Sequence, residues 1–350
     1  STDIVEAQRK NETAKVRNVG ITFETRPDWA KERHVDEMLG FGVTRVELGV
    51  QTLNDAVYEK IERGHRVKDV VDATQILKDS GLKVGYHMMP GLFTDFDGDI
   101  EIFRSVFNDE RFMPDVIKIY PTLVIKGTGL YRLWKKGEFT PYSDEEAVEL
   151  VTEIKKMMPK WIRTMRIQRD IPSGLIEAGV KKSNLGELVY KKLGDEGVSC
   201  RCIRCRDIGH RTYKEGIKFN EDDLEVLVTR YNASGGIEHF ISIEDRGNDA
   251  LIGYLRLRFP SEKAHRKEVT PETSIIRELR VLGQATPLGT VLDEATQHRG
   301  FGATLIQKAE EISGKSDKNI VLITSAIGTR EYYKKFGYSR VGPYMEKTLV

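Results

Sequence analysis

One loop of the sequence has residue types that suit a phosphate-rich ligand. Residues 297–303 read QHRGFGA, and a helix is expected directly after them, over 304–312. Two glycines one residue apart let backbone N–H groups turn toward a ligand without obstruction by a Cβ atom, and the helix N-terminus behind them carries partial positive charge. The pattern predicts a pyrophosphate-binding loop, although a simple turn into a helix has the same two glycines.

A pair of tyrosines follows this loop, in the segment REYYKKFGY at residues 330–338. A tyrosine hydroxyl beside an acyl thioester can protonate the departing thiolate, because that thiolate is the base in the step. A strand is expected before the loop at 278–282, and an apolar strand after it at 319–325. We therefore expect one tyrosine to act as a general acid and the other to pack in the core.

All three cysteines fall in one short segment, SCRCIRCRDIGH at residues 199–210. Cys200, Cys202 and Cys205 have C-x-C-x2-C spacing, and three thiolates this close in a loop are well placed to bind Zn²⁺. We expect a structural zinc that joins two domains, with an iron–sulfur cluster and unliganded buried thiols as the alternatives. Three histidines are candidates for the fourth ligand, namely His210, which is nearest in sequence, and the more distant His65 and His87.

The elements that position these residues begin with an α/β part, residues 1–180. Short apolar strands are expected at 19–24, 45–50, 83–88, 116–120 and 164–168, and amphipathic helices between them at 33–39, 69–79, 100–107 and 144–158. Ser143 and Glu146 have the spacing of a capping box for the last helix. This alternation predicts parallel strands joined by helical crossovers. Five such units are fewer than a complete barrel needs, so we expect a partial, TIM-like barrel that lacks its first strands.

Two further parts follow along the chain. Residues 181–216 are expected to form a basic, zinc-binding segment between domains. Residues 217–350 are expected to form an α+β domain, because strand patterns at 224–231, 238–244, 251–257 and 276–282 precede a helix, an apolar strand, a short helix and a final strand pair.

Composition excludes several classes of protein. The 350 residues are 39% hydrophobic and 31% charged, with a net charge of +1, so neither a uniformly basic nucleic-acid coat nor an acidic tail is present. No apolar run approaches the roughly 18 residues of a membrane span, and no signal peptide is apparent. Three clustered cysteines are too few for a disulfide framework, which predicts a reducing, cytoplasmic location.

The C-terminal part resembles the GNAT acetyltransferase superfamily, whose acetyl-CoA loop reads Q/R-x-x-G-x-G/A; the match covers about residues 220–350. The resemblance implies that the 297–300 loop takes the pyrophosphate and that Tyr333 lies at the thioester as the catalytic acid. The acetyl-CoA contacts that it implies are Glu278, Leu279, Arg280, Val281, Gln297, Arg299, Gly300, Phe301, Gly302, Ala303 and Tyr333.

The front half contains GITFETRPDW, TRVELGVQ, GYHMMPGL, KIYPTLVIKGTGLY and RIQRDIP, which leave polar side chains at the C-terminal ends of the expected strands. Chemistry happens at that end of α/β barrels. These segments resemble the radical SAM barrel of the Elongator catalytic subunit family, and the resemblance covers essentially the whole chain. By a looser transfer, Glu24, Glu47 and Gln51 match positions that face S-adenosylmethionine in related barrels.

The resemblance implies a tRNA uridine acetyltransferase that builds a carboxymethyl-type group at C5 of the wobble uridine. Acetyl-CoA would supply the acetyl unit, and a radical made from S-adenosylmethionine at an iron–sulfur (4Fe-4S) cluster would activate it. The expected partners are a tRNA anticodon stem–loop and either a second copy of the chain or accessory subunits.

A basic band could contact this RNA. Residues 151–216 carry 15 Lys/Arg against 8 Asp/Glu, a surplus of +7 that the rest of the chain offsets with −6. An ordinary solvated helix face explains this charge equally well. The candidate phosphate contacts are Lys155, Lys156, Arg163, Arg166, Arg169, Lys181, Lys182, Lys191 and Lys192.

One departure from the family pattern affects the expected activity. The family holds its cluster with three cysteines near the first strand, and neither these nor the GG-containing strand behind them is present. We therefore expect an N-terminally truncated chain in which the radical step is inactive. The competing interpretations are a protein lysine N-acetyltransferase with Glu278 as its general base, and a tRNA-binding scaffold that holds acetyl-CoA as a regulatory ligand.

Overall fold

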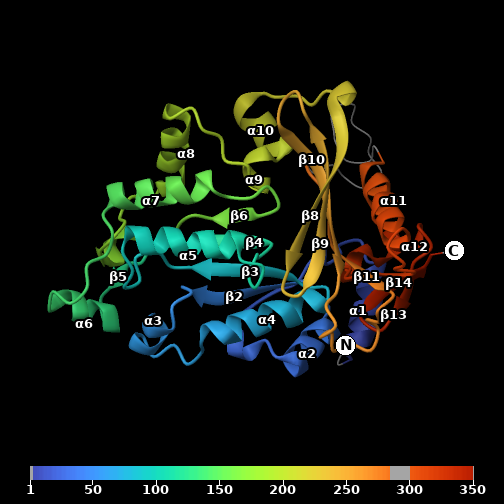
Figure 1. The fold of residues 1–350 in the computed structure, drawn as a ribbon, viewed down its shortest axis with the longest axis horizontal. Coiled ribbons are helices and arrows are strands. Elements are labelled where there is room, and N and C mark those ends of the chain that lie inside the picture. The colour runs from blue at the N-terminus through green and yellow to red at the C-terminus, as the bar shows by residue number, and fades with distance from the viewer. Residues whose placement is uncertain (1–2, 284–299, 350) are drawn as a thin grey trace.

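The computed structural model describes residues 3–283 and 300–349, arranged around two main sheets (Figure 1). A five-stranded sheet has the order β1-β2-β3-β4-β6, and a seven-stranded sheet has the order β13-β14-β12-β11-β10-β9-β8. We call them the parallel sheet and the mixed sheet. In Figure 1 the long strands β8, β9 and β10 run across the strands of the parallel sheet.

The parallel sheet carries the predicted strand–helix alternation. All four of its neighbouring strand pairs are parallel. Its strands are β1 (Thr22–Thr25), β2 (Arg45–Gln51), β3 (Lys83–Met88), β4 (Val116–Ile119) and β6 (Arg163–Arg166). The helices that connect them are α2 (Glu32–Phe41), α3 (Asp55–Lys60), α4 (Val67–Asp79), α5 (Phe96–Asn108), α6 (Gly129–Lys135) and α7 (Asp144–Lys156). The α/β partial barrel expected from the sequence is confirmed.

The N-terminus of α7 shows how local sequence fixes one of these helices. The backbone N–H of Glu146 donates to the Ser143 hydroxyl at 3.2 Å, and the N–H of Ser143 donates to the Glu146 carboxylate at 2.8 Å. This is the predicted capping box, and it satisfies two N–H groups that the helix itself leaves unpaired.

The mixed sheet contains one parallel pair, β11 with β12, among antiparallel neighbours. Its strands are β8 (Leu224–Ala233), β9 (Gly236–Asp245), β10 (Ala250–Phe259), β11 (Thr273–Val281), β12 (Ile320–Ile323), β13 (Ser339–Val341) and β14 (Tyr344–Thr348). Pairing of β11 with β12 ends at Ile276 and Ile323, whereas β11 continues to Val281. The two strands therefore separate and leave a wedge between them.

Smaller elements complete the fold. The helices α11 (Phe301–Gly314) and α12 (Arg330–Lys334) belong to the mixed-sheet part, and α8 (Leu185–Asp195), α9 (Ile203–Arg206) and α10 (Ile208–Glu215) connect the two sheets. The remaining elements are α1 (Ile4–Glu12), η1 (Pro27–Trp29), β5 (Val124–Ile125), η2 (Ser173–Leu175), β7 (Ile176–Ala178), η3 (Glu221–Asp223) and η4 (Ile327–Thr329). Within the described ranges, no helix is both long and apolar enough to cross a bilayer.

Buried ion pairs hold the two sheets together. Arg277 of β11 donates to both oxygens of Asp115, just before β4, at 2.7 and 2.8 Å. Arg258 of β10 donates to Asp79 at the end of α4, at 2.8 Å. Glu238 of β9 accepts from both arginines, at 2.7 and 3.0 Å. All five side chains are almost fully buried, so the relative placement of the sheets depends on matched charges.

Candidate functional site

A cavity of about 310 Å³ opens where β11 and β12 separate. One wall consists of Glu278, Leu279 and Arg280 on β11. The opposite wall includes Thr324, just after β12, and Tyr333 of α12. The N-terminal edge of the parallel sheet closes the cavity with Val19, Gly20, Thr22, Thr44, Arg45 and Lys83. The cavity therefore lies between the two sheets. Residues 19–21, predicted as strand, lie before β1 in this chain.

The two tyrosines, one of which is predicted to be the general acid, have different surroundings in the structure. Tyr333 lines the cavity and is only 7% exposed, and burial raises the pKa of its hydroxyl, which keeps it protonated at neutral pH. Tyr332 is 37% exposed and packs edge-on against Phe336. Tyr333 thus presents a protonated hydroxyl at the wall of the cavity.

Glu278 faces the same cavity as an ionised carboxylate. Burial alone would raise the pKa of Glu278, but Arg256 and Lys83, with Arg280, hold it below its usual range. The Arg256 guanidinium donates to Glu278 at 2.9 Å. A paired carboxylate with a lowered pKa is a weak base, which disfavours the lysine-acetyltransferase role considered for Glu278.

The glycine-containing segment opens α11, which begins at Phe301 rather than at residue 304 as predicted. Gly300 is the N-cap with a φ of +84°, a backbone conformation that favours glycine. A Cβ at Gly300 would meet no atom of the described residues within 4 Å, whereas one at Gly302 would lie 2.4 Å from the Tyr332 hydroxyl oxygen. Of the remaining predicted acetyl-CoA contacts, Val281 ends β11 and Ala303 lies in the first turn of α11, while Gln297 and Arg299 lie outside the described residues.

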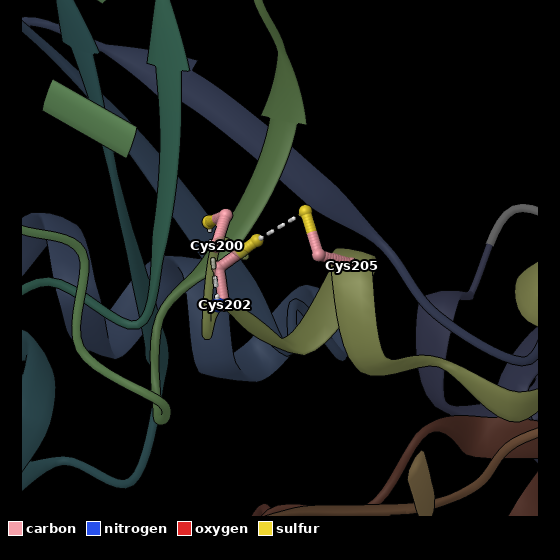
Figure 2. Close-up of side chains that lie close together, drawn as sticks. All are labelled: Cys200, Cys202 and Cys205. Atoms are coloured by element: carbon pink, nitrogen blue, oxygen red, sulfur yellow. Dashed lines mark hydrogen bonds between the residues drawn. The ribbon is translucent and has the colours of Figure 1, made fainter. Parts of the chain in front are cut away.

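The three cysteines converge as the spacing predicts (Figure 2). Their sulfur atoms lie within 4.8 Å of one another, and Cys200 and Cys202 are buried while Cys205 is half-buried. Hydrogen bonds from Cys200 and Cys205, with the ammonium of Lys155, hold the pKa of the Cys202 thiol well below its usual range. A thiolate among thiols at this spacing fits a Zn²⁺ ion, which takes sulfur ligands in a tetrahedral set.

The three cysteines leave one position of a tetrahedral zinc site for a fourth ligand. No His, Asp or Glu atom of the described residues joins the three sulfurs in their group. His65 packs against the ring of Tyr58, and His87 contacts Glu47, so neither barrel histidine lies with the three sulfurs. His210 lines a neighbouring cavity of about 350 Å³ that Cys200 and Cys205 also line.

Lys155 corrects one prediction about RNA contacts. Its side chain is fully buried, and its Nζ lies 3.2 Å from the Cys202 sulfur and 3.4 Å from the Cys205 sulfur. It therefore cannot reach a phosphate at the surface. Arg163 is half-buried and forms an ion pair with Asp207 at 3.5 Å.

The other predicted RNA contacts remain at or near the surface. Lys156, Arg166, Lys182 and Lys192 each pair with a nearby carboxylate. The Arg169 guanidinium stacks over the ring of Tyr120, 5.1 Å from its centroid. Lys181 and Lys191 are exposed.

The predicted S-adenosylmethionine positions divide into two places. Glu24 and Glu47 are register partners on β1 and β2 and share the ammonium of Lys118, which lies 2.9 Å from Glu24. His87 Nε2 lies 2.8 Å from the Glu47 carboxylate. Burial opposes ionisation of Glu47, but hydrogen bonds from His87 and Lys118 lower its pKa to about 2. This cluster of two acids and two basic groups faces one side of the sheet.

Gln51 lies beyond this cluster, at the end of β2. It lines a separate cavity of about 590 Å³, together with Lys60, Arg63, Arg132, Lys136 and Arg169. The cysteines lie elsewhere, since the N–H of Ile203 donates to Ile162, just before β6, at 2.9 Å. The thiols therefore do not fit an iron–sulfur cluster that would act at the C-terminal ends of the strands.

Sequence reasoning missed the residues that the two sheets contribute jointly. Lys83 and Arg45 form part of the cavity wall beside Glu278, and Lys118 sits at the centre of the acidic pair. The strand–helix alternation predicted a strand that begins at Lys83. The neighbouring residues in sequence did not indicate which other part of the chain this end of the strand would contact.

Comparisons with known proteins agree with this architecture. The Radical SAM superfamily matches residues 2–106, and the Radical_SAM C-terminal domain matches residues 114–195. The parallel sheet is therefore of the radical SAM class.

Individual relatives match over the whole chain. A tRNA uridine(34) acetyltransferase of Methanocaldococcus jannaschii is 51% identical over 352 residues, which cover 100% of this chain and 65% of that protein. Elongator complex protein 3 of Homo sapiens is 43% identical over 100% of this chain and 64% of its own length. The chain thus spans about 65% of the length of the curated relatives it matches.

A solved structure matches closely. The archaeal Methanocaldococcus infernus Elp3 with an N-terminal deletion (1–46) superposes with a TM-score of 0.96 at 50% identity, covering 100% of this chain and 82% of that one. The chain belongs to the Elp3 family.

Proposed function

We propose that this chain is an acetyl-CoA-dependent acyltransferase that acts on the wobble uridine of tRNA. The observation that carries the proposal is the cavity at the β11–β12 wedge, which has a buried, protonated Tyr333 on one wall and β11 on the other. Two relatives named tRNA uridine(34) acetyltransferase, each 51% identical, support the choice of substrate.

Acetyl-CoA would lie with its pantetheine arm in the wedge. Leu279 and Arg280 pair with β10 on one side, but pairing with β12 on the other side has already ended, so backbone groups on that side are available to an amide-containing ligand. The pyrophosphate would lie before α11, where a helix N-terminus follows Gly300, a residue without a Cβ. Tyr333 would then donate its proton to the thiolate that leaves on acyl transfer.

Glu24 and Glu47 would hold S-adenosylmethionine, because ionised carboxylates accept hydrogen bonds from an ammonium group and from ribose hydroxyls. The low pKa of Glu47 keeps that acceptor charged throughout the neutral range. When bound beside a reduced iron–sulfur cluster, S-adenosylmethionine supplies an organic radical. Because the three cysteines lie by Ile162 and do not fit that cluster, we expect no radical step from this 350-residue chain.

Cys200, Cys202 and Cys205 would hold a structural zinc. Three thiolates give Zn²⁺ a net negative charge, which the buried ammonium of Lys155 compensates. The segment ties the two sheets together, since Asp207 forms a β-bridge with Leu251 of β10. His210 is the proposed fourth ligand.

Phosphates of the anticodon stem–loop would contact the exposed members of the basic band. These are Arg166, Arg169, Lys181, Lys182 and Lys191. Such contacts release counterions, so binding should weaken steeply as salt rises.

Calorimetric titration with acetyl-CoA tests the proposal at its first step. Leu279→Trp adds a large ring to the cavity wall and should abolish binding, whereas Leu175→Trp, at the exposed last residue of η2, should leave it unchanged. Circular dichroism establishes that both variants are folded. Equal affinity for the Leu279→Trp variant would contradict the proposed site.

A further inference from the structure

One lysine of the parallel sheet lines the cavity at the β11–β12 wedge, where acetyl-CoA is proposed to bind. Lys83 begins β3 at the N-terminal edge of the sheet, beside its register partner Arg45. Among the described residues that line the cavity, it is the only lysine. No hydrogen bond or ion pair with another described residue engages its ammonium group, whereas Arg45 pairs with Glu47 and Arg277 with Asp115. Lys83 therefore offers an uncommitted primary amine.

The surroundings of Lys83 make its ammonium group easier to deprotonate than that of an ordinary lysine. Burial lowers its pKa to about 8, and the nearby Arg45 and Arg280 act in the same direction. Glu278 on the facing wall and Asp115 oppose them only in part. An amine at this pKa is partly unprotonated at neutral pH, as a nucleophile must be.

We propose that Lys83 accepts an acetyl group from acetyl-CoA bound in this cavity and becomes Nε-acetyl-lysine. The inference rests on the proposed function, because it needs acetyl-CoA in the wedge. The amine nitrogen attacks the thioester carbonyl carbon, a C–N bond forms and the C–S bond breaks. Tyr333 protonates the departing thiolate, and the proton released from the nitrogen restores the tyrosine hydroxyl. The products are an amide and free CoA, so atoms and charge balance.

Acetylation of Lys83 would hinder the binding of a second acetyl-CoA. The acetylated side chain is longer, uncharged and fixed to the cavity wall, so it occupies the space that the acetyl end of a second acetyl-CoA needs. It also removes a positive neighbour of Glu278, one of the groups that hold that carboxylate ionised. Modification of Lys83 should therefore lower the affinity of the chain for acetyl-CoA.

The test is incorporation of label from [¹³C]acetyl-CoA into the full chain, followed by peptide mass spectrometry. We expect one acetyl group per chain on Lys83, lost in Lys83→Arg, and slowed in Tyr333→Phe. Lys68→Arg, at an exposed lysine of α4, is the matched control and should label normally. Because the reacting amine titrates near 8, the initial rate should rise about tenfold between pH 7 and pH 9.

Two results would overturn the inference. Label spread over exposed lysines, undiminished in Lys83→Arg, would indicate non-enzymatic acetylation. Calorimetric binding of acetyl-CoA without label on Lys83 would remove Lys83 as an acceptor and leave the proposed function intact. Absence of acetyl-CoA binding would instead overturn the proposed function, and this inference with it.

Discussion

Asp115 is the residue whose replacement most directly tests how the two sheets are joined. Its carboxylate is fully buried and accepts two hydrogen bonds from Arg277 of the mixed sheet, at 2.7 and 2.8 Å. It also accepts from the N–H of Val84, at 2.8 Å, and lies 3.5 Å from Arg256. Asp115→Asn keeps the shape but removes the charge, and it replaces one accepting oxygen with a donor that opposes an arginine.

The expected loss in the free energy of unfolding follows from burial. Removing one partner of a buried ion pair costs about 3–5 kcal/mol, because the other charge stays buried without compensation. Glu238 still contacts Arg277 at 2.7 Å and keeps the loss from going higher. Since a domain is stable by about 5–15 kcal/mol, this loss is a large part of the total.

Urea unfolding followed by circular dichroism at pH 7 measures the effect. Asp195→Asn, at an exposed carboxylate on α8, is the matched control and should change stability by less than about 0.5 kcal/mol. The double variant Asp115→Leu with Arg277→Met removes both charges and should recover part of the loss. If Asp115→Asn has the same free energy of unfolding as the control variant, the buried pair does not hold the sheets together and the reasoning fails.

Three further predictions concern the tyrosine acid, the metal centre and a buried carboxyl group. Tyr333→Phe should bind acetyl-CoA normally but cleave the thioester about 10²–10⁴-fold more slowly, with Tyr332→Phe as control; equal rates would move the acid elsewhere. Elemental analysis should find about one zinc per chain, lost in Cys202→Ser, and an unchanged zinc content in that variant would contradict the metal centre. Burial raises the pKa of Asp99 to about 7, despite a hydrogen bond from Tyr142. When the pKa of an acid is higher in the folded than in the unfolded protein, where it is about 4, the free energy of unfolding falls as pH rises through that interval. Asp99→Asn should therefore flatten the decline in stability between pH 4 and pH 7. An equally steep decline in the variant would refute this.

Local patterns predicted the elements well, for identifiable reasons. β3 has the predicted bounds, because its apolar run is preceded by a glycine turn at Gly81 and followed by Pro90. The capping box at Ser143 likewise depends only on residues three apart. Such signals are complete within a few residues, so no tertiary information is needed.

Contacts between distant segments could not be predicted. Lys155 has the sequence context of a surface lysine near a helix end, but cysteines in a later segment fold over it and bury it. Lys83 acquires its place in the cavity wall only when β11 packs across the edge of the parallel sheet. In both cases the chemistry of the side chain is set by a partner that its own neighbours in sequence do not indicate.

Release of free CoA from acetyl-CoA, with and without tRNA, tests the central claim most directly. The account predicts that the chain cleaves acetyl-CoA, that tRNA accelerates this, and that Tyr333→Phe suppresses it. It predicts no acceleration by a lysine-containing peptide, because the Glu278 carboxylate is paired with Arg256 and held ionised. Release triggered by the peptide while tRNA has no effect would contradict the account and identify a protein acetyltransferase.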